Sequence, residues 1–327
     1  MTRPGENGTE REAWPLLAEP PGSAACLALR QAAFRKGRGM DGHRAYVWGA
    51  IGVDARPCPE SCGFCSLGEA WGLVPPGGQE LSTDEVVERA AFLSGQGAAT
   101  VTLRTTQHYG AARLAELGQA VRRVIRPGVR LACNTGECAP SEMARLREAG
   151  FDTAYHVVRL REGEDTRLRP ESRAASLRAT QGAGLEIAFL VEPVGPEHTP
   201  DELADRARMA RQHGAAVIGA MARVPVRGTP LYDRGAVSEE RLACLCAYAR
   251  LCDHAARLVC VHPPGLAALR SGANVVVVEM AANPRDEPGT GSDSFRGFGF
   301  PEARALMAEA GLAFCGEYHK DQASGFA

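Results

Sequence analysis

The chain has 327 residues, with 45% apolar and 23% charged residues, which is ordinary for a soluble globular protein and enough for one large domain or two small ones. Its formal net charge of −2 gives no electrostatic case for nucleic acid or an anionic membrane as the main partner. The opening MTRPGENGTEREAWP lacks the apolar segment of a secretory signal, and no stretch approaches the roughly 20 apolar residues of a membrane span. We therefore expect a cytoplasmic protein without a membrane or nucleic-acid partner.

The eleven cysteines do not suggest a disulfide framework. Their number is odd, and a chain of this length can build a core without covalent cross-links. Metal or thiol chemistry is the better interpretation for the cysteines that cluster. The scattered ones are expected to be small packing residues or to carry no signal: Cys26, Cys244, Cys246, Cys252 and Cys315.

Residues 1–44 are predicted to form a helical N-terminal extension. After them a short apolar segment followed by a longer amphipathic one recurs eight times. Apolar segments of four to nine residues are expected of parallel strands that are buried on both faces. They span residues 45–53, 100–103, 130–133, 153–158, 185–192, 216–222, 258–262 and 274–280.

The amphipathic segments have identifiable helix starts. Ser82 and Glu85 have the spacing of a capping box, and Thr199 and Glu202 have the same spacing around a proline. Ser238 is expected to cap a further helix.

Eight strand–helix units predict an α/β fold, a (βα)8 TIM-type barrel over residues 45–327 that follows the helical extension. An open, six-stranded partial barrel is the alternative. Residues 281–299 are predicted to be a long Gly/Pro/Ser-rich loop after the last strand, and such a loop is usually a lid, a binding loop or disordered. In a barrel the chemistry lies at the C-terminal ends of the strands.

The sequence CPESCGFC follows directly on the first predicted strand. The thiolates of Cys58, Cys62 and Cys65 can hold three irons of a cubane cluster and leave the fourth iron without a protein ligand. That iron can chelate the amino and carboxylate groups of a methionine moiety and pass one electron to an adjacent sulfonium. The competing interpretation is a zinc site, but zinc takes four ligands and no second pair is evident. We predict a [4Fe–4S] cluster at these three cysteines.

The CxxxCxxC spacing, with Phe64 before the last cysteine, resembles the signature of the radical S-adenosylmethionine (SAM) superfamily. Four further segments resemble its biotin synthase-like branch, which includes methylornithine synthase and a hydrogenase maturase. These segments are ACNTGE at 132–137, Tyr155-His156, PESRAASL at 170–177 and VPVRGTPL at 224–231, and the likeness covers roughly residues 45–315.

The resemblance implies SAM as co-substrate and an external one-electron donor of the flavodoxin or ferredoxin type. It implies SAM contacts at Phe64, Asn134, Glu137, Arg173 and Val226. Arg173 offers a planar fork suited to a carboxylate, and Glu137 is an acceptor for an ammonium or ribose hydroxyl. From the residues alone, a solvated helix arginine and a loop carboxylate explain these two positions equally well.

The chain departs from biotin synthase at the second cluster of that family, which three strand cysteines and an arginine hold. Cys133 matches one of those positions, but no cysteine stands near Ala188 on the fifth strand, and His262 stands about where the arginine would be. Biotin formation is therefore not expected. Cys133 and Cys138 are expected either to ligate a different auxiliary Fe–S cluster or to be a thiol pair near the active site. The alternative is that Cys133 is a buried core residue and Cys138 a loop thiol, without a functional role.

Basic and imidazole side chains at the predicted strand ends are candidates for binding a small, anionic substrate. An equally weighted alternative is that these groups cap loops or pair with acids such as Glu279. Glu197 and His198 share one strand end with Glu192, where acid–base help is conceivable. The candidate catalytic residues are His156, Glu192, Cys133 and Cys138, and the candidate substrate-binding residues are Arg104, His108, Arg159, Arg223 and His262.

Three functions fit these patterns. The favoured one is radical hydrogen abstraction from a small molecule in cofactor or secondary-metabolite biosynthesis, with rearrangement, fragmentation or oxidation as the outcome. The second is sulfur insertion, as in lipoyl or biotin synthases, through an auxiliary cluster on Cys133 and Cys138. The third is a metal-binding or maturation scaffold that never cleaves SAM.

Overall fold

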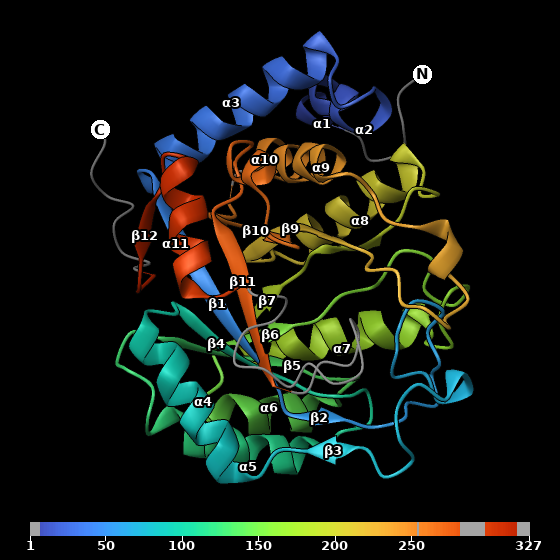
Figure 1. Ribbon diagram of the computed structural model, residues 1–327, viewed down its shortest axis with the longest axis vertical. Coiled ribbons are helices and arrows are strands. Elements are labelled where there is room, and N and C mark those ends of the chain that lie inside the picture. The colour runs from blue at the N-terminus through green and yellow to red at the C-terminus, as the bar shows by residue number, and fades with distance from the viewer. Residues whose placement is uncertain (1–6, 254, 282–297, 319–327) are drawn as a thin grey trace.

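The computed structural model describes residues 7–253, 255–281 and 298–318 (Figure 1). The predicted loop at 281–299 lies outside the described residues except at its ends.

Eight parallel strands form a closed barrel, so the predicted TIM-type fold is confirmed and the open partial barrel is wrong. The ring is closed where β9 pairs with both β7 and β10, and where β11 pairs with β1. Around the ring the strands are β1 (Arg44–Gly52), β4 (Thr100–Arg104), β5 (Arg130–Asn134), β6 (Thr153–Tyr155), β7 (Glu186–Ala188), β9 (Val217–Ala222), β10 (Leu258–His262) and β11 (Val275–Ala281).

Additional short strands modify this ring. The apolar segment at 185–192 was expected as one strand, but it is divided into β7 and β8 (Val191–Val194), and β8 pairs with β9 with an irregular register. The short β12 (Ala313–Cys315) lies beside the start of β1. An antiparallel pair, β2 (Asp54–Ala55) and β3 (Gln79–Glu80), brackets the cysteine loop.

Alternation along the strands sorts the side chains into two layers. Residues such as Val47, Leu103 and Cys133 pack into the large core between the strands and the helices. Trp48 and Cys260 belong to a separate cluster inside the barrel. Because successive strand side chains point to opposite faces, the polar residues that end several strands point into the mouth of the barrel.

The surrounding helices begin where the sequence predicts. The capping boxes at Ser82 and Thr199 are both formed, and the Ser238 hydroxyl accepts the backbone N–H of Arg241 at 3.2 Å. The helices are α4 (Thr83–Gln96), α5 (Ala111–Arg122), α6 (Pro140–Glu148), α7 (Pro170–Gly182), α8 (Pro200–Gln212), α9 (Glu239–Cys252), α10 (Leu266–Leu269) and α11 (Phe300–Glu309).

Three helices precede the barrel: α1 (Gly8–Ala13), α2 (Pro15–Ala18) and α3 (Ala24–Asp41). They pack against α9, at the top of Figure 1. Buried Glu10 ties this region to Arg208 and Arg211 of α8. A domain boundary at residue 44 stays a prediction. Across the described residues, none of the helices combines the length and the apolar character needed to cross a membrane.

Candidate functional site

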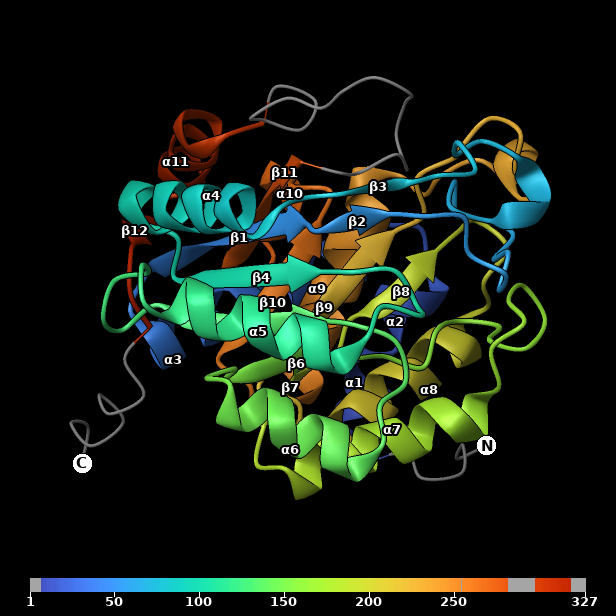
Figure 2. The ribbon, with the colours of Figure 1, turned by 90° about the horizontal axis from the view of Figure 1, so that it is seen from below.

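The loops that follow β1, β6 and β9 lie together at the C-terminal end of the barrel (Figure 2). The cysteine loop is part of the connection after β1 and begins directly after β2. Hydrogen bonds within the loop hold its backbone in a compact conformation. The N–H of Cys58 donates to the carbonyl of Leu67 at 2.7 Å, and the N–H of Cys65 donates to the carbonyl of Cys62 at 2.9 Å. Ser61 has a left-handed φ of 41°, and its hydroxyl accepts the N–H of Ala70 at 3.1 Å. These bonds hold the three partly exposed thiols on one short loop.

Ionisation of Cys58 and Cys62 is disfavoured, chiefly by burial. Burial raises the pKa of Cys58, and the neighbouring Cys65 raises it further. Burial also raises the pKa of Cys62 to about 12, against the lowering effect of the nearby Arg159. Three thiolates side by side therefore need a compensating positive charge. A bound metal centre provides it, because a coordinating thiol is deprotonated outright.

The cysteine loop packs against the loops after β6 and β9. The N–H of Gly63 donates to the carbonyl of Asp165 at 2.8 Å, and Gly63 accepts the N–H of Leu231 at 2.9 Å. The half-buried Phe64 therefore lies next to the segment in which Val226 starts a turn closed by Thr229. Two of the expected SAM-contact segments are thus adjacent.

Two more of the expected SAM-contact residues lie together in the mouth. Arg173, from the first turns of α7, has its Nε 3.6 Å from Oε1 of Glu137. The same Nε lies 3.3 Å from Oε1 of Glu162, a buried residue after β6 that no sequence pattern indicated. Burial lowers the pKa of Arg173, and nearby Arg159 lowers it further, against the raising effect of Glu162 and Glu137.

Orphaned atoms in this group provide a test of whether SAM fits. Within the described ranges, Nε and Nη1 of Arg173, Oε1 of Glu137 and Oε1 of Glu162 are buried without a hydrogen-bond partner. Buried polar groups normally have partners. A ligand with both a carboxylate and an ammonium would supply an acceptor to the arginine and donors to the glutamates, so the residues fit the methionyl end of SAM.

The barrel interior below these residues is lined by polar groups at the strand ends. The hydroxyl of Tyr155 donates to Glu192, and Nε of Arg159 lies 3.4 Å from the same carboxylate. Next to β1, Glu279 lies 3.3 Å from Arg104 and 3.8 Å from His262. Asn134 ends β5, which presents it to the same interior. This part of the mouth could hold a small substrate.

The arginines expected to grip an anion are therefore paired with acids. Arg104 pairs with Glu279, and Arg159 pairs with Glu192 and Glu162. For Arg104 and Arg159, the structure therefore agrees with the interpretation that these arginines pair with acids. An anion that used either arginine would have to displace a carboxylate.

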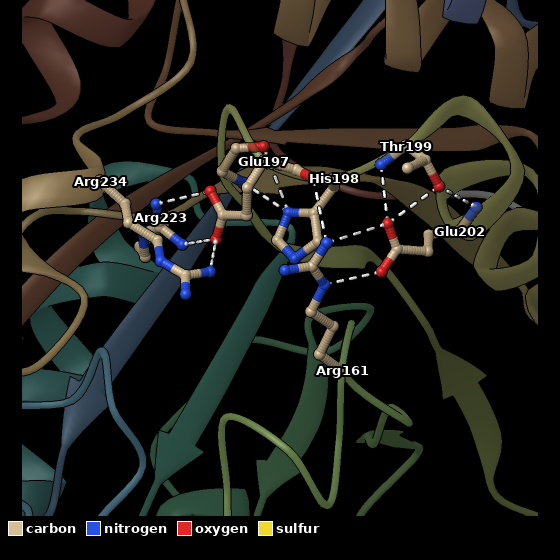
Figure 3. A network of polar contacts seen from close by, with 8 residues as sticks. Arg161, Glu197, His198, Thr199, Glu202, Arg223 and Arg234 are labelled. Atoms are coloured by element: carbon tan, nitrogen blue, oxygen red, sulfur yellow. Dashed lines mark hydrogen bonds and ion pairs between the residues drawn. The ribbon is translucent and has the colours of Figure 1, made fainter.

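Arg223 lies in a different network, between the loops after β8 and β9 (Figure 3). Its guanidinium binds both oxygens of Glu197 and the carbonyl of Gly235. Burial opposes ionisation of Glu197, but the hydrogen bonds from Arg223 lower its pKa to about 2. Glu197, His198 and Asp165 offer ligand atoms within 4.8 Å of one another. Because Arg223 already neutralises Glu197, we interpret this group as an ion-pair cluster.

The remaining candidate residues lie on the surface beside the cysteine loop, next to Arg173 and Arg159, or in the outer core. His108 is exposed, 3.0 Å from Glu60, beside a surface cleft of about 370 Å³ that Cys58 also lines. His156 is buried, and burial together with Arg173 and Arg159 lowers its pKa well below the ordinary value, so its imidazole is neutral. Cys133 and Cys138 belong to the core outside the strands.

Sequence reasoning missed two residues of the mouth. Glu162 lies in the irregular loop after β6, where no spacing marks it. Cys260 lies inside the barrel with its pKa raised by burial, and Glu192 raises it further. The available signal was that Cys260 stands two residues before His262 in the same strand, so both side chains point to the same face.

None of the protein-family models matches the chain. It is 26% identical over 196 residues to a biotin synthase of Desulforudis audaxviator (strain MP104C), covering 58% of this chain and 60% of the relative. It is 26% identical over 226 residues to a biotin synthase of Delftia acidovorans (strain DSM 14801 / SPH-1), covering 64% and 61%. The chain thus spans about six tenths of the length of these curated relatives.

Two solved structures share the fold. Methylornithine synthase has a TM-score of 0.75 at 19% identity, with 95% of each chain covered. The FeFe-hydrogenase maturase HydG of Carboxydothermus hydrogenoformans has a TM-score of 0.77 at 14% identity, covering 95% of this chain and 76% of its own.

A closed barrel with a three-cysteine loop after its first strand is the arrangement that the resemblance to radical SAM proteins implies. The chain is thus similar in sequence to biotin synthases and shares its fold with methylornithine synthase and HydG.

Proposed function

We propose that the chain is a radical SAM enzyme that abstracts hydrogen from a small molecule in cofactor or secondary-metabolite biosynthesis. When bound, a [4Fe–4S] cluster and SAM would supply a 5′-deoxyadenosyl radical and thereby start a rearrangement, fragmentation or oxidation. The observation that carries the proposal is a group of buried polar atoms on Glu137, Glu162 and Arg173 that form ion pairs with one another but have no hydrogen-bond partner among the described residues, in a mouth that the cysteine loop borders.

The residues of the chain have separable roles in this proposal. Cys58, Cys62 and Cys65 would hold the cluster. Arg173 would orient the SAM carboxylate, and Glu137 would accept from its ammonium. The backbone around Phe64 and Val226 and the side chain of Asn134 would border the adenosine.

The substrate would lie in the barrel interior beside Tyr155 and Glu192. An anion would bind Arg104 or Arg159 only by displacing the carboxylate with which that arginine is paired. We therefore propose a small polar substrate, for which His262 offers a ring nitrogen, Nδ1, that is buried and unpaired within the described ranges. An external one-electron donor of the flavodoxin or ferredoxin type would deliver electrons, for which the surface cleft beside Cys58 is an available approach.

Replacement of all three loop cysteines by alanine tests the proposal. After anaerobic reconstitution, the wild-type protein should hold iron and sulfide, and on reduction with dithionite it should convert SAM to 5′-deoxyadenosine. The triple variant should do neither. A matched control replaces Cys26, Cys244 and Cys252, which lie in the core, and should keep the iron. Formation of 5′-deoxyadenosine by the triple loop variant, or zinc instead of iron in the wild type, would contradict the proposal.

A further inference from the structure

A continuous series of buried charges joins the proposed SAM subsite to the barrel interior. Oε1 of Glu162 lies 3.3 Å from Nε of Arg173 and 3.7 Å from Nη1 of Arg159. Arg159 in turn contacts Glu192 at 3.4 Å. Glu192 accepts the hydroxyl of Tyr155, so one path of contacts runs from the cofactor side to the substrate side. In order it comprises Glu137, Arg173, Glu162, Arg159, Glu192 and Tyr155.

Glu162 is the shared member of this series. Its side chain is 1% exposed, and the same carboxylate oxygen contacts buried Arg173 and half-buried Arg159. Arg159 lowers the pKa of Arg173, because two guanidinium groups close together repel one another. A carboxylate between them offsets that repulsion. Loss of its charge would leave both arginines under-compensated, which is costly in a buried site.

The local backbone is built to present this carboxylate. Its second oxygen, Oε2, accepts the N–H of Arg159 at 2.9 Å and fixes the turn from 159 to 162. Within that turn Arg161 has a φ of 50°, in the left-handed region that non-glycine residues rarely adopt. Figure 3 shows how Arg161 is held there, by Oε1 of Glu202 at 2.7 Å and the carbonyl of Glu197 at 3.0 Å.

We propose that Glu162 is a positioning residue that couples SAM binding to the substrate half of the site. The inference rests on the proposed function, since it concerns the same site. When SAM is bound, Arg173 would pair with its carboxylate, and Glu162 would then shift toward Arg159. Arg159 then holds Glu192 less strongly, and Glu192 and Tyr155 become available to a substrate. By linkage, a change of charge at Glu192 must alter the affinity for SAM.

The first test is Glu162→Gln, which keeps the shape of the side chain and removes its charge. The matched control is Glu164→Gln, an exposed position on the same loop. With reconstituted proteins, iron content, the SAM dissociation constant by equilibrium dialysis, and the EPR spectrum of the reduced cluster with and without SAM are measured. Because Glu162 and the SAM carboxylate compete for Arg173 in this proposal, Glu162→Gln should keep its iron, bind SAM about tenfold more tightly and show the SAM-induced spectral change at correspondingly lower SAM concentrations. Glu164→Gln should match the wild type.

The second test is a double-mutant cycle with Glu192→Gln. This change should shift the SAM dissociation constant several-fold in the wild-type background and much less when Glu162 is also Gln. Should Glu162→Gln fail to hold iron, Glu162→Asp, which keeps the charge on a shorter side chain, should hold iron and bind SAM with intermediate affinity.

The outcomes separate the two proposals. If the wild type binds SAM normally, two results overturn the coupling alone. One is an equal effect of Glu192→Gln on SAM affinity in both backgrounds. The other is wild-type SAM affinity in the Glu162 variants. A wild-type protein that holds its iron and binds no SAM overturns the proposed function and the coupling with it.

Discussion

Arg173 is a deeply buried arginine whose Nε and Nη1 have no hydrogen-bond partner among the described residues. Because a bidentate carboxylate satisfies such a fork, Arg173→Ala should weaken SAM binding by roughly 100-fold and leave the iron content unchanged. Arg173→Lys, which keeps the charge without the fork, should lie between the two. Equilibrium dialysis measures both, and the exposed Arg178→Ala on the same helix is the control. Unchanged affinity in Arg173→Ala would remove this residue from the site.

Glu197 gives a pH-dependent contribution to stability. Its pKa is lowered to about 2 in the folded protein. The stabilisation by its charge is therefore present above the ordinary glutamate pKa of about 4.3 and is lost as the pH falls toward 2. Glu197→Gln should lower the free energy of unfolding at pH 7 by about 1–3 kcal/mol, because Arg223 loses its charged partner. The difference from the wild type should shrink as the pH falls from about 4 to 2.

Urea unfolding at several pH values measures this difference, with Glu164→Gln as a matched exposed control. A difference that stays constant down to pH 2 would show that the charge of Glu197 does not stabilise the fold.

Single residues differ in how visible they are to sequence analysis. Cys58, Cys62 and Cys65 could be recognised because one loop carries the whole ligand set, so spacing along the chain reports proximity in space. Glu162 could not be recognised, because it lies in an irregular turn. Its partner Arg159 lies in the same turn and its partner Arg173 lies on α7, and no sequence pattern indicates that these three side chains meet.

At the scale of elements, the loop after β4 and the loop after β5 are in close backbone contact at Gly136. A Cβ on Gly136 would lie 1.9 Å from the carbonyl oxygen of Gln107, which is impossible without movement of the backbone. The side-chain amide of Gln107 also donates to Glu137. The position of the proposed SAM acceptor therefore depends on the close approach of these two loops.

Gly136→Ala should push these loops apart, weaken SAM binding at least tenfold and lower the free energy of unfolding by about 1–3 kcal/mol. Gly182→Ala, at the end of α7, is the matched control, because a Cβ there meets nothing within 4 Å. Thermal unfolding and equilibrium dialysis measure the two effects. Wild-type SAM affinity in Gly136→Ala would show that the loop contact does not position the site.

Helix starts that depend on residues within one turn were predicted well. Strands whose limits depend on pairing with another strand were not. The capping boxes at Ser82 and Thr199 formed because both partners lie within one turn. The split of residues 185–192 into β7 and β8 was invisible, because pairing with β9 decides it. The short β12 was missed for the same reason, since its only regular feature is its register with β1.

At the scale of the whole molecule, closure of the barrel separates the interior from the outer core. Cys133 is fully buried and Cys138 nearly so, both in the core outside the strands. We therefore expect one cubane, with about four irons per chain after anaerobic reconstitution, and no auxiliary cluster on these thiols. Iron and sulfide analysis measures the count, and Cys133→Ala should leave it unchanged. A count of about six to eight irons would favour the sulfur-insertion function instead.

The sequence by itself determined the rhythm of strands and helices, the helix caps and the three-cysteine loop, because each of these depends on residues close together along the chain. The tertiary structure decided the rest. Barrel closure set which strand faces point inward, and it paired Arg104 and Arg159 with acids. Packing of the loop after β6 against α7 placed Glu162 between two arginines. The Arg104–Glu279 contact joins residues far apart in the chain, and the contacts of Glu162 depend on an irregular turn that no sequence pattern marks, so spacing in a single sequence carries no record of either.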